Sequence, residues 1–177
     1  MNIEISIDVP VSSHVKKYLE NSRYFKTQFK LTSTDHVGSY LMHLLKPVPK
    51  KYHPLKQNKN SVKFTGVYWS VNLAGYSDRG KWYIDARGIN CFNNFVDDII
   101  KTELYIYVDA NRYVPGNKVT NLINDFIDKY NFTTEELTFE GLKKAYFRYR
   151  KSLEFIDNKQ IKIFSENLSL KNTKQNS

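Results

Sequence analysis

The segment from Gly141 to Lys151 holds the residue types best suited to binding a charged partner. It carries five positive charges, three aromatic rings and no acidic residue. The five charges belong to Lys143, Lys144, Arg148, Arg150 and Lys151. At helical spacing, one side of this segment is an apolar stripe without these cations, made of Leu142, Tyr146, Tyr149 and Leu153. A helix that buries such a stripe leaves its cations on the surface, which is typical of contact with a polyanion.

A second basic stretch lies in the N-terminal half, where no acidic residue occurs from His36 to Ser77. We predict a mobile surface loop there, with five lysines that assist binding: Lys50, Lys51, Lys56, Lys59 and Lys63. From Gly88 to Glu140 the balance reverses, with nine acids against four bases. Charge segregated in this way either brings two basic elements against one partner or joins an acidic helix of one subunit to a basic helix of the next.

The sequence contains residues capable of catalysis or metal binding, but their spacing does not match a known catalytic or metal-binding motif. The four histidines are far apart, and no His-x-x-x-His or Cys-x-x-Cys pattern occurs. Four acids share one predicted helix: Asp97, Asp98, Glu103 and Asp109. They either coordinate Mg²⁺ or form a solvated acidic face, and we favour the solvated face. We therefore expect a protein that is not an enzyme, with no catalytic residue, metal or cofactor.

Length and composition favour one domain with a single core. The chain has 177 residues, of which 41% are hydrophobic, and a formal net charge of +9. Its one cysteine, Cys91, cannot form an intrachain disulfide, so a reducing compartment fits. No stretch approaches the roughly 18 apolar residues of a membrane helix, and the N-terminus lacks signal-peptide features. We expect a domain over residues 1–156, a polar and partly disordered tail over 157–177, no membrane partner and a cytoplasmic location.

Hydrophobic periodicity predicts strands in the first half of the chain. Ile3, Ile5, Ile7 and Val9 alternate with polar residues until Pro10, as in a short half-buried strand. The segment 62–86 alternates on both sides of a Gly-containing turn and predicts a β-hairpin. Ser12 or Ser13 and the Ser33-Thr34-Asp35 cluster are suited to capping two intervening helices. The expected class is α+β, with the first strand and the hairpin forming a small antiparallel sheet.

The helical pattern dominates residues 90–156. A helix is predicted from Asn90 to about Tyr113, the longest of the chain, and a second helix follows Asn117. A basic helix then opens at Thr138 and is expected to end near Phe155. The last two helices have the outline of a helix-turn-helix, although their linker is longer than the tight turn of that motif.

One pattern covers Leu122 to Lys151: a Phe-Ile-x-x-Tyr helix followed by a Leu-Lys-Lys-x-Tyr-x-Arg-x-Arg helix. Its residues here are Phe126, Ile127, Tyr130, Leu142, Lys143, Lys144, Tyr146, Arg148 and Arg150. In this part the chain resembles small uncharacterised proteins of bacterial phages and other mobile elements. The resemblance implies a phage or an integrated element as the setting, hence the host cytoplasm or the virion, and it implies no catalytic residue.

Together these features predict a nucleic-acid-binding protein that contacts phosphates through its basic C-terminal helix. We expect DNA rather than RNA as the partner. The alternative is a structural or assembly protein, such as a phage-particle component, whose segregated charges join identical subunits. A homo-oligomer is the partner that this alternative implies.

Overall fold

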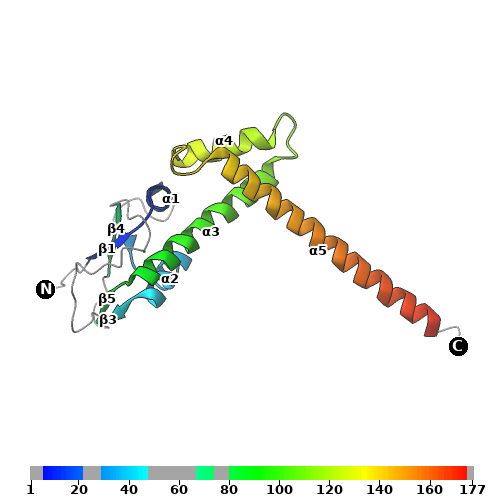
Figure 1. Cartoon of the computed structure of the whole chain (residues 1–177), viewed down its shortest axis with the longest axis horizontal. Helices are drawn as coiled ribbons and strands as arrows, with labels where there is room; N and C mark the ends of the chain where they lie inside the picture. The colour runs from blue at the N-terminus through cyan, green and yellow to red at the C-terminus, as the bar shows by residue number, and fades with distance from the viewer. Residues whose placement is uncertain (1–5, 22–28, 48–66, 74–79, 175–177) are drawn as a thin grey trace.

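A computed structural model of the chain describes residues 6–21, 29–47, 67–73 and 80–174, with side chains as far as Ile156. Its elements in chain order are β1 (Ser6–Pro10), α1 (Ser13–Asn21), β2 (Phe29–Lys30), α2 (His36–Leu44), β3 (Lys46–Pro47), β4 (Tyr68–Asn72), β5 (Lys81–Tyr83), α3 (Ala86–Asn111), α4 (Val119–Tyr130) and α5 (Phe139–Lys174). Helix α3 is central: the strands, α1 and α2 lie along its N-terminal part, and α4 and α5 lie at its C-terminal end (Figure 1). The predicted α+β class is confirmed.

The larger sheet has three strands in the order β1-β4-β2. Strand β1 is antiparallel to β4, with Val9 opposite Trp69, which confirms the predicted first strand from Ser6 onward. Ile3 and Ile5 lie outside the described residues. Strand β2 adds on the other side and runs parallel to β4, with Phe29 opposite Val71. The sheet is therefore mixed rather than purely antiparallel.

The predicted hairpin does not form between the described strands. Strand β5 pairs with β3 instead, with Lys46 opposite Tyr83. The physical reason is that β1 and β2 occupy both edges of β4, which leaves no free edge for β5. Residues 62–66, where we expected the hairpin to begin, lie outside the described part of the chain.

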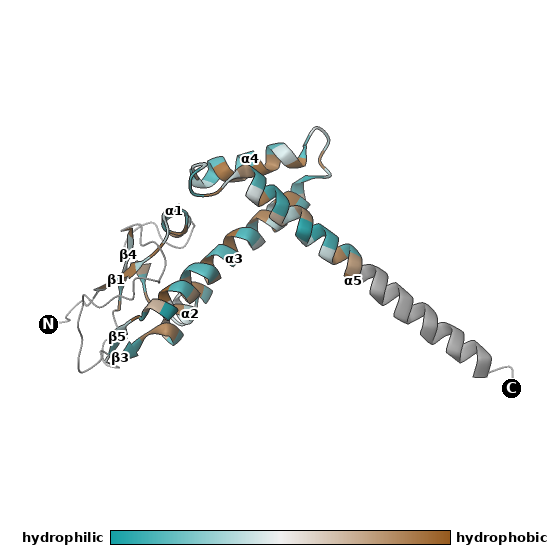
Figure 2. Ribbon diagram, viewed as in Figure 1, coloured by the Kyte–Doolittle hydropathy of each residue, from teal (hydrophilic) through white to brown (hydrophobic). Residues whose placement is uncertain are grey.

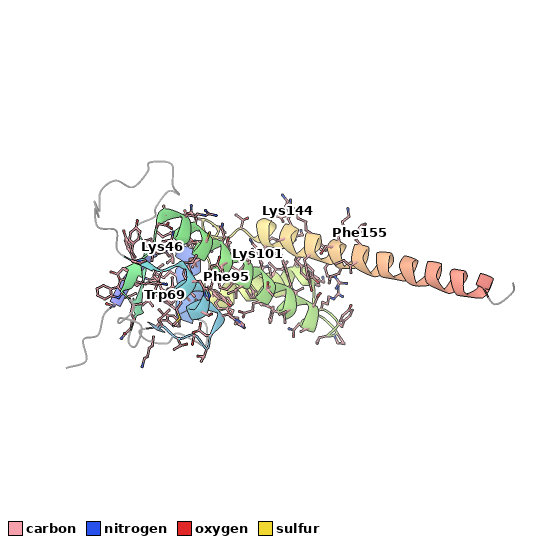
Figure 3. The ribbon with its side chains drawn as sticks, turned by 90° about the horizontal axis from the view of Figure 1, so that it is seen from below. Lys46, Trp69, Phe95, Lys101, Lys144 and Phe155 are labelled. Carbon is pink, nitrogen blue, oxygen red and sulfur yellow. The ribbon has the colours of Figure 1, made fainter. Side chains whose placement is uncertain are left out.

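The N-terminal part of the core is built on aromatic rings. Trp69 is buried and stacks on Phe29 at 4.8 Å and on Phe92 at 5.8 Å between ring centroids, which ties the sheet to α3. Tyr40 stacks on Phe95 at 4.0 Å and ties α2 to the same helix. Figure 3 shows Trp69 and Phe95 in this packed end of the molecule. These contacts hold α3 in place for the helices that follow it.

Carboxylate caps set the first residues of two helices. Asp35 accepts a hydrogen bond of 2.7 Å from the backbone N–H of Gly38, as its position before α2 predicted. Asp85 accepts one of 2.7 Å from Gly88, so α3 begins at Ala86 and earlier than expected. The Lys46 side chain also donates to Asp85, and these two hydrogen bonds hold the pKa of Asp85 below its ordinary value.

Helix α5 differs from its predicted length. It continues to Lys174, well past Phe155, and the backbone of most of the predicted tail is helical. With 36 residues it is longer than α3, which has 26, so the expectation that α3 is the longest helix was wrong. Figure 2 shows hydrophobic and hydrophilic positions alternating along α3, α4 and the first turns of α5, the pattern of amphipathic helices.

Candidate nucleic-acid interface

Helix α5 is attached to the rest of the molecule through the predicted aromatic stripe. The exposed fractions of Leu142 and Tyr146 are 3% and 1%, and Tyr149 is partly buried against the same core. The rings of Tyr149 and Tyr105 stack at 4.4 Å and so join α5 to α3. Because this stripe faces α3 and α4, the opposite side of α5 points to solvent.

Asp109, at the end of α3, fixes the rotation of α5 about its own axis. Its carboxylate accepts a hydrogen bond of 2.7 Å from the Tyr146 hydroxyl. The Arg150 guanidinium donates to the same carboxylate at 3.4 Å, and Arg112 lies 3.4 Å from it. The partly buried hydrogen bond from Tyr146 and the contact with Arg150 both come from α5, and together they leave this helix little freedom to turn.

Arg150 therefore has a different place from the other predicted binding residues. Its guanidinium lies beside Asp109 at the junction of the two helices, where it balances a partly buried acid. We assign Arg150 to the attachment of α5 rather than to the exposed surface. The charge pattern of the sequence alone does not distinguish these two roles.

The remaining cations of the basic segment lie together on the solvent side of α5. We call this surface the outer face and define it by Lys143, Lys144, Phe147, Arg148, Lys151 and Phe155. At about 100° per residue these positions fall on one side of the helix, opposite the buried stripe. A shallow concavity of about 290 Å³ lies on it, lined by Glu140 and all of these residues except Phe155.

Most charges of the outer face have no acidic partner in the part of the chain that the structure describes. Lys143 lies 3.5 Å from Glu140, one turn away on the same helix. Within the described residues, no carboxylate forms an ion pair with Lys144, Arg148 or Lys151. Figure 3 shows Lys144 on the first turns of α5 and Phe155 further along the same helix. Three uncompensated positive charges within about two helical turns make this a local anion-attracting surface.

The comparisons with known proteins add no family. No protein-family model, curated protein or solved structure matches the chain. Function must therefore be argued from the residues themselves.

The second group of predicted binding residues cannot be placed. Lys50, Lys51, Lys56, Lys59 and Lys63 all lie outside the described residues.

The outer face also includes the ring of Phe155, which is not among the binding residues predicted from the sequence. Phe155 is eight residues after Phe147 and four after Lys151. Residues at this spacing share one side of a helix, so the sequence already indicates that Phe155 lies beside them.

A contact among Ser12, His14 and Asp97 does not have the geometry of a catalytic relay. His14 Nε2 lies 2.6 Å from Asp97 and 3.3 Å from the Ser12 hydroxyl. Both partners share a single ring nitrogen, whereas a relay requires serine and aspartate on opposite nitrogens.

In the described part of the chain, no cluster of three or more His, Cys, Asp or Glu side chains is arranged to hold a metal. No helix among these residues has the length and apolar character to span a membrane.

The carboxylate of Glu103 accepts three hydrogen bonds, two of them from α4, and so holds α4 against α3. Glu103 of α3 accepts hydrogen bonds from Tyr18 of α1 at 2.7 Å and from Lys129 of α4 at 2.8 Å. Tyr130 of α4 donates to the same carboxylate. Burial opposes the charged form, but the three donors hold the pKa of Glu103 below its ordinary value. The acids that sequence reasoning assigned to a solvated face are thus partly structural.

The two tyrosines bonded to these acids predict a loss of stability in alkali. Burial and the hydrogen bond to Glu103 raise the pKa of Tyr130 to about 12, and burial with the bond to Asp109 does the same for Tyr146. Both values lie above the ordinary 10.0, so this stability is complete below pH 10 and is lost as pH rises through 12. We expect the urea midpoint to fall between about pH 10 and 12.

Lysine ion pairs also weaken in this range, so a variant must isolate the phenols. Replacing both Tyr130 and Tyr146 by Phe should flatten the alkaline part of the profile. Tyr113→Phe, which removes a phenol 77% exposed, should leave that profile unchanged. A wild-type midpoint that is constant to pH 11.5 would contradict the role given to these hydroxyls.

Proposed function

We propose that this chain is a non-enzymatic nucleic-acid-binding protein of a phage or mobile element, which contacts DNA phosphates through the outer face of α5. The observation that carries the proposal is the set of three cations, Lys144, Arg148 and Lys151, without ion-pair partners among the described residues. They span seven residues, or about 10 Å of helix axis, which corresponds to about three base-pair steps of DNA.

The position of the acids favours nucleic acid over self-assembly through charge. In the alternative function, an assembly protein, the acids between Asp97 and Glu140 would have to receive the basic helix of a neighbouring subunit. Several of them already have partners in their own chain: Asp97, Asp98, Glu103, Asp109, Glu136 and Glu140. Fewer acids are then left to attract a neighbour's cations.

The phage or mobile-element setting, and with it the host cytoplasm or virion as location, rests on the C-terminal sequence pattern. The structure divides that pattern into two roles. Leu142 and Tyr146 are buried at the attachment of α5, whereas Lys143, Lys144 and Arg148 belong to the outer face. In the helix-turn-helix interpretation, α4 would be the first helix and α5 the one that enters the major groove.

The salt dependence of binding tests the proposal. Fluorescence anisotropy with a labelled DNA duplex should give an affinity that falls by about 2.7 log units per log unit of salt if three phosphates are neutralised. The corresponding value for a single strand is about 2.1, because single strands condense fewer counterions. Absence of binding to either form at low salt, or binding that does not depend on salt, would contradict the proposed function.

A further inference from the structure

The two exposed aromatic rings of the outer face are not explained by phosphate binding. The exposed fraction of Phe147 is 51% and that of Phe155 is 69%. Phe147 lies among the cations of the concavity, one turn after Lys143 and one turn before Lys151. Phenylalanine has no polar group to engage a phosphate or water, so exposing it on a charged helix leaves apolar surface for a partner with an apolar face.

The ring of Phe147 is held in place by its neighbour. Tyr146 packs edge to face against it, with 5.7 Å between centroids and 63° between ring planes. Tyr146 is itself buried and hydrogen-bonded to Asp109. Phe147 therefore contacts the residue that attaches α5 to α3, and its other side stays open to a stacking partner.

Resting on the proposed function, we propose that the DNA bound by α5 is single-stranded and that unpaired bases stack on Phe147 and Phe155. Lysine and arginine contact the phosphates of duplexes and single strands alike, so the rings decide between them. In a duplex the faces of the bases are covered by their neighbours, and only their edges reach a protein. In a single strand each face is open to an aromatic ring.

The spacing of the outer face fits an extended strand. Phe147 and Phe155 are eight residues apart, or about 12 Å along the helix axis, with Lys151 midway between them. Rings and cations alternate at this spacing, which is how single-strand binders combine base stacking with a charged track for the backbone. The concavity is shallow and open to solvent, and Phe147 lies in it among the cations.

The lining of the concavity also limits what the surface recognises. It consists of lysines, an arginine, a glutamate and a phenylalanine, so its donors are charged groups that the phosphates of RNA and DNA engage alike. A protein distinguishes RNA from DNA through hydrogen bonds to the 2′-hydroxyl, and single-strand binders without base-edge contacts are tolerant of sequence. An RNA strand of the same sequence should bind within about threefold of the DNA.

Anisotropy titrations of the full chain with oligo(dT), the matching RNA and a duplex of equal length test the proposal. Phe147→Leu keeps an apolar side chain but removes the aromatic face. It should weaken single-strand binding by about 5-fold to 150-fold, the equivalent of about 1–3 kcal/mol per stacked base, and change duplex binding less than about twofold. Phe147→Tyr should restore the affinity, and Phe155→Leu should weaken it in the same selective way.

The matched control is Tyr68→Leu, which removes a ring of similar exposure, 50%, from β4 at the other end of the molecule (Figure 1). It should leave both affinities unchanged. Salt-dependent binding that Phe147→Leu leaves intact, or weakens equally on duplex and single strand, would overturn the single-strand proposal while the proposed function stands. A strong preference for RNA would also overturn it. No binding to any of the three probes would reject both.

Discussion

Reversing two charges on the outer face, Lys144→Glu together with Arg148→Glu, should lower the affinity for DNA by at least about a hundredfold. Each change removes a phosphate contact and places a negative charge where the phosphate would lie, and like charges brought together cost several kcal/mol. The fold should be unaffected, because no described carboxylate pairs with either residue. Binding is measured by anisotropy, and folding by circular dichroism and urea denaturation.

The control for this variant carries the same change in net charge elsewhere. Lys30 and Lys81 are exposed on strands at the opposite end of the molecule from α5, and both are replaced by Glu. This control should keep most of the affinity. If it loses as much as the α5 variant, overall charge rather than the outer face governs binding. Light scattering of both proteins also addresses the assembly alternative, which predicts that only the α5 variant dissociates an oligomer.

Tyr146→Ala should have the largest effect on stability, a loss of about 3–5 kcal/mol in the free energy of unfolding. The substitution removes a fully buried ring that contacts Tyr105 and Tyr149, and it leaves Asp109 without its shortest hydrogen bond. Urea denaturation followed by circular dichroism measures the loss. A loss under about 1 kcal/mol would show that α5 is not held through this residue.

Two further variants separate packing from hydrogen bonding at this position. Tyr146→Phe keeps the ring and removes only the donor to Asp109, so its cost should be about 1–2 kcal/mol. Tyr113→Ala removes a tyrosine that is largely exposed and should cost less than about 0.5 kcal/mol. We therefore expect the loss in free energy of unfolding to be largest for Tyr146→Ala, smaller for Tyr146→Phe and smallest for Tyr113→Ala.

Local signals in the sequence predicted which segments are helical, but not where α3 begins or where α5 ends. The Asp35 cap and the stripe through Leu142 and Tyr146 each depend on residues within a few turns, and the structure confirms them. The predicted end of α5 near Phe155 was wrong, because a polar composition does not by itself end a helix. No glycine or proline follows Phe155, so nothing in the sequence interrupts the helix before Lys174.

Contacts between distant residues could not be predicted in the same way. The partner of β5 depends on β4 already having two neighbours, and no local pattern in Trp82 or Tyr83 shows this. Arg150 looked equivalent to Arg148 by charge and spacing, but only the fold brings Asp109 beside one of them. For the site, sequence therefore identified the basic helix and its buried side but not which cations serve its attachment.

Strand β4 pairs with β1 and β2, which lie far from it in the sequence, and this affects how the chain folds. Its register joins Asn72 to Ser6 and Val71 to Phe29, residues separated by long stretches of chain, whereas α3, α4 and α5 contact their neighbours in sequence. Closing a long loop costs entropy before the contacts that offset it can form. We therefore expect the helices after Asp85 to assemble first, and closure of the sheet around β4 to limit the rate at which the complete domain forms.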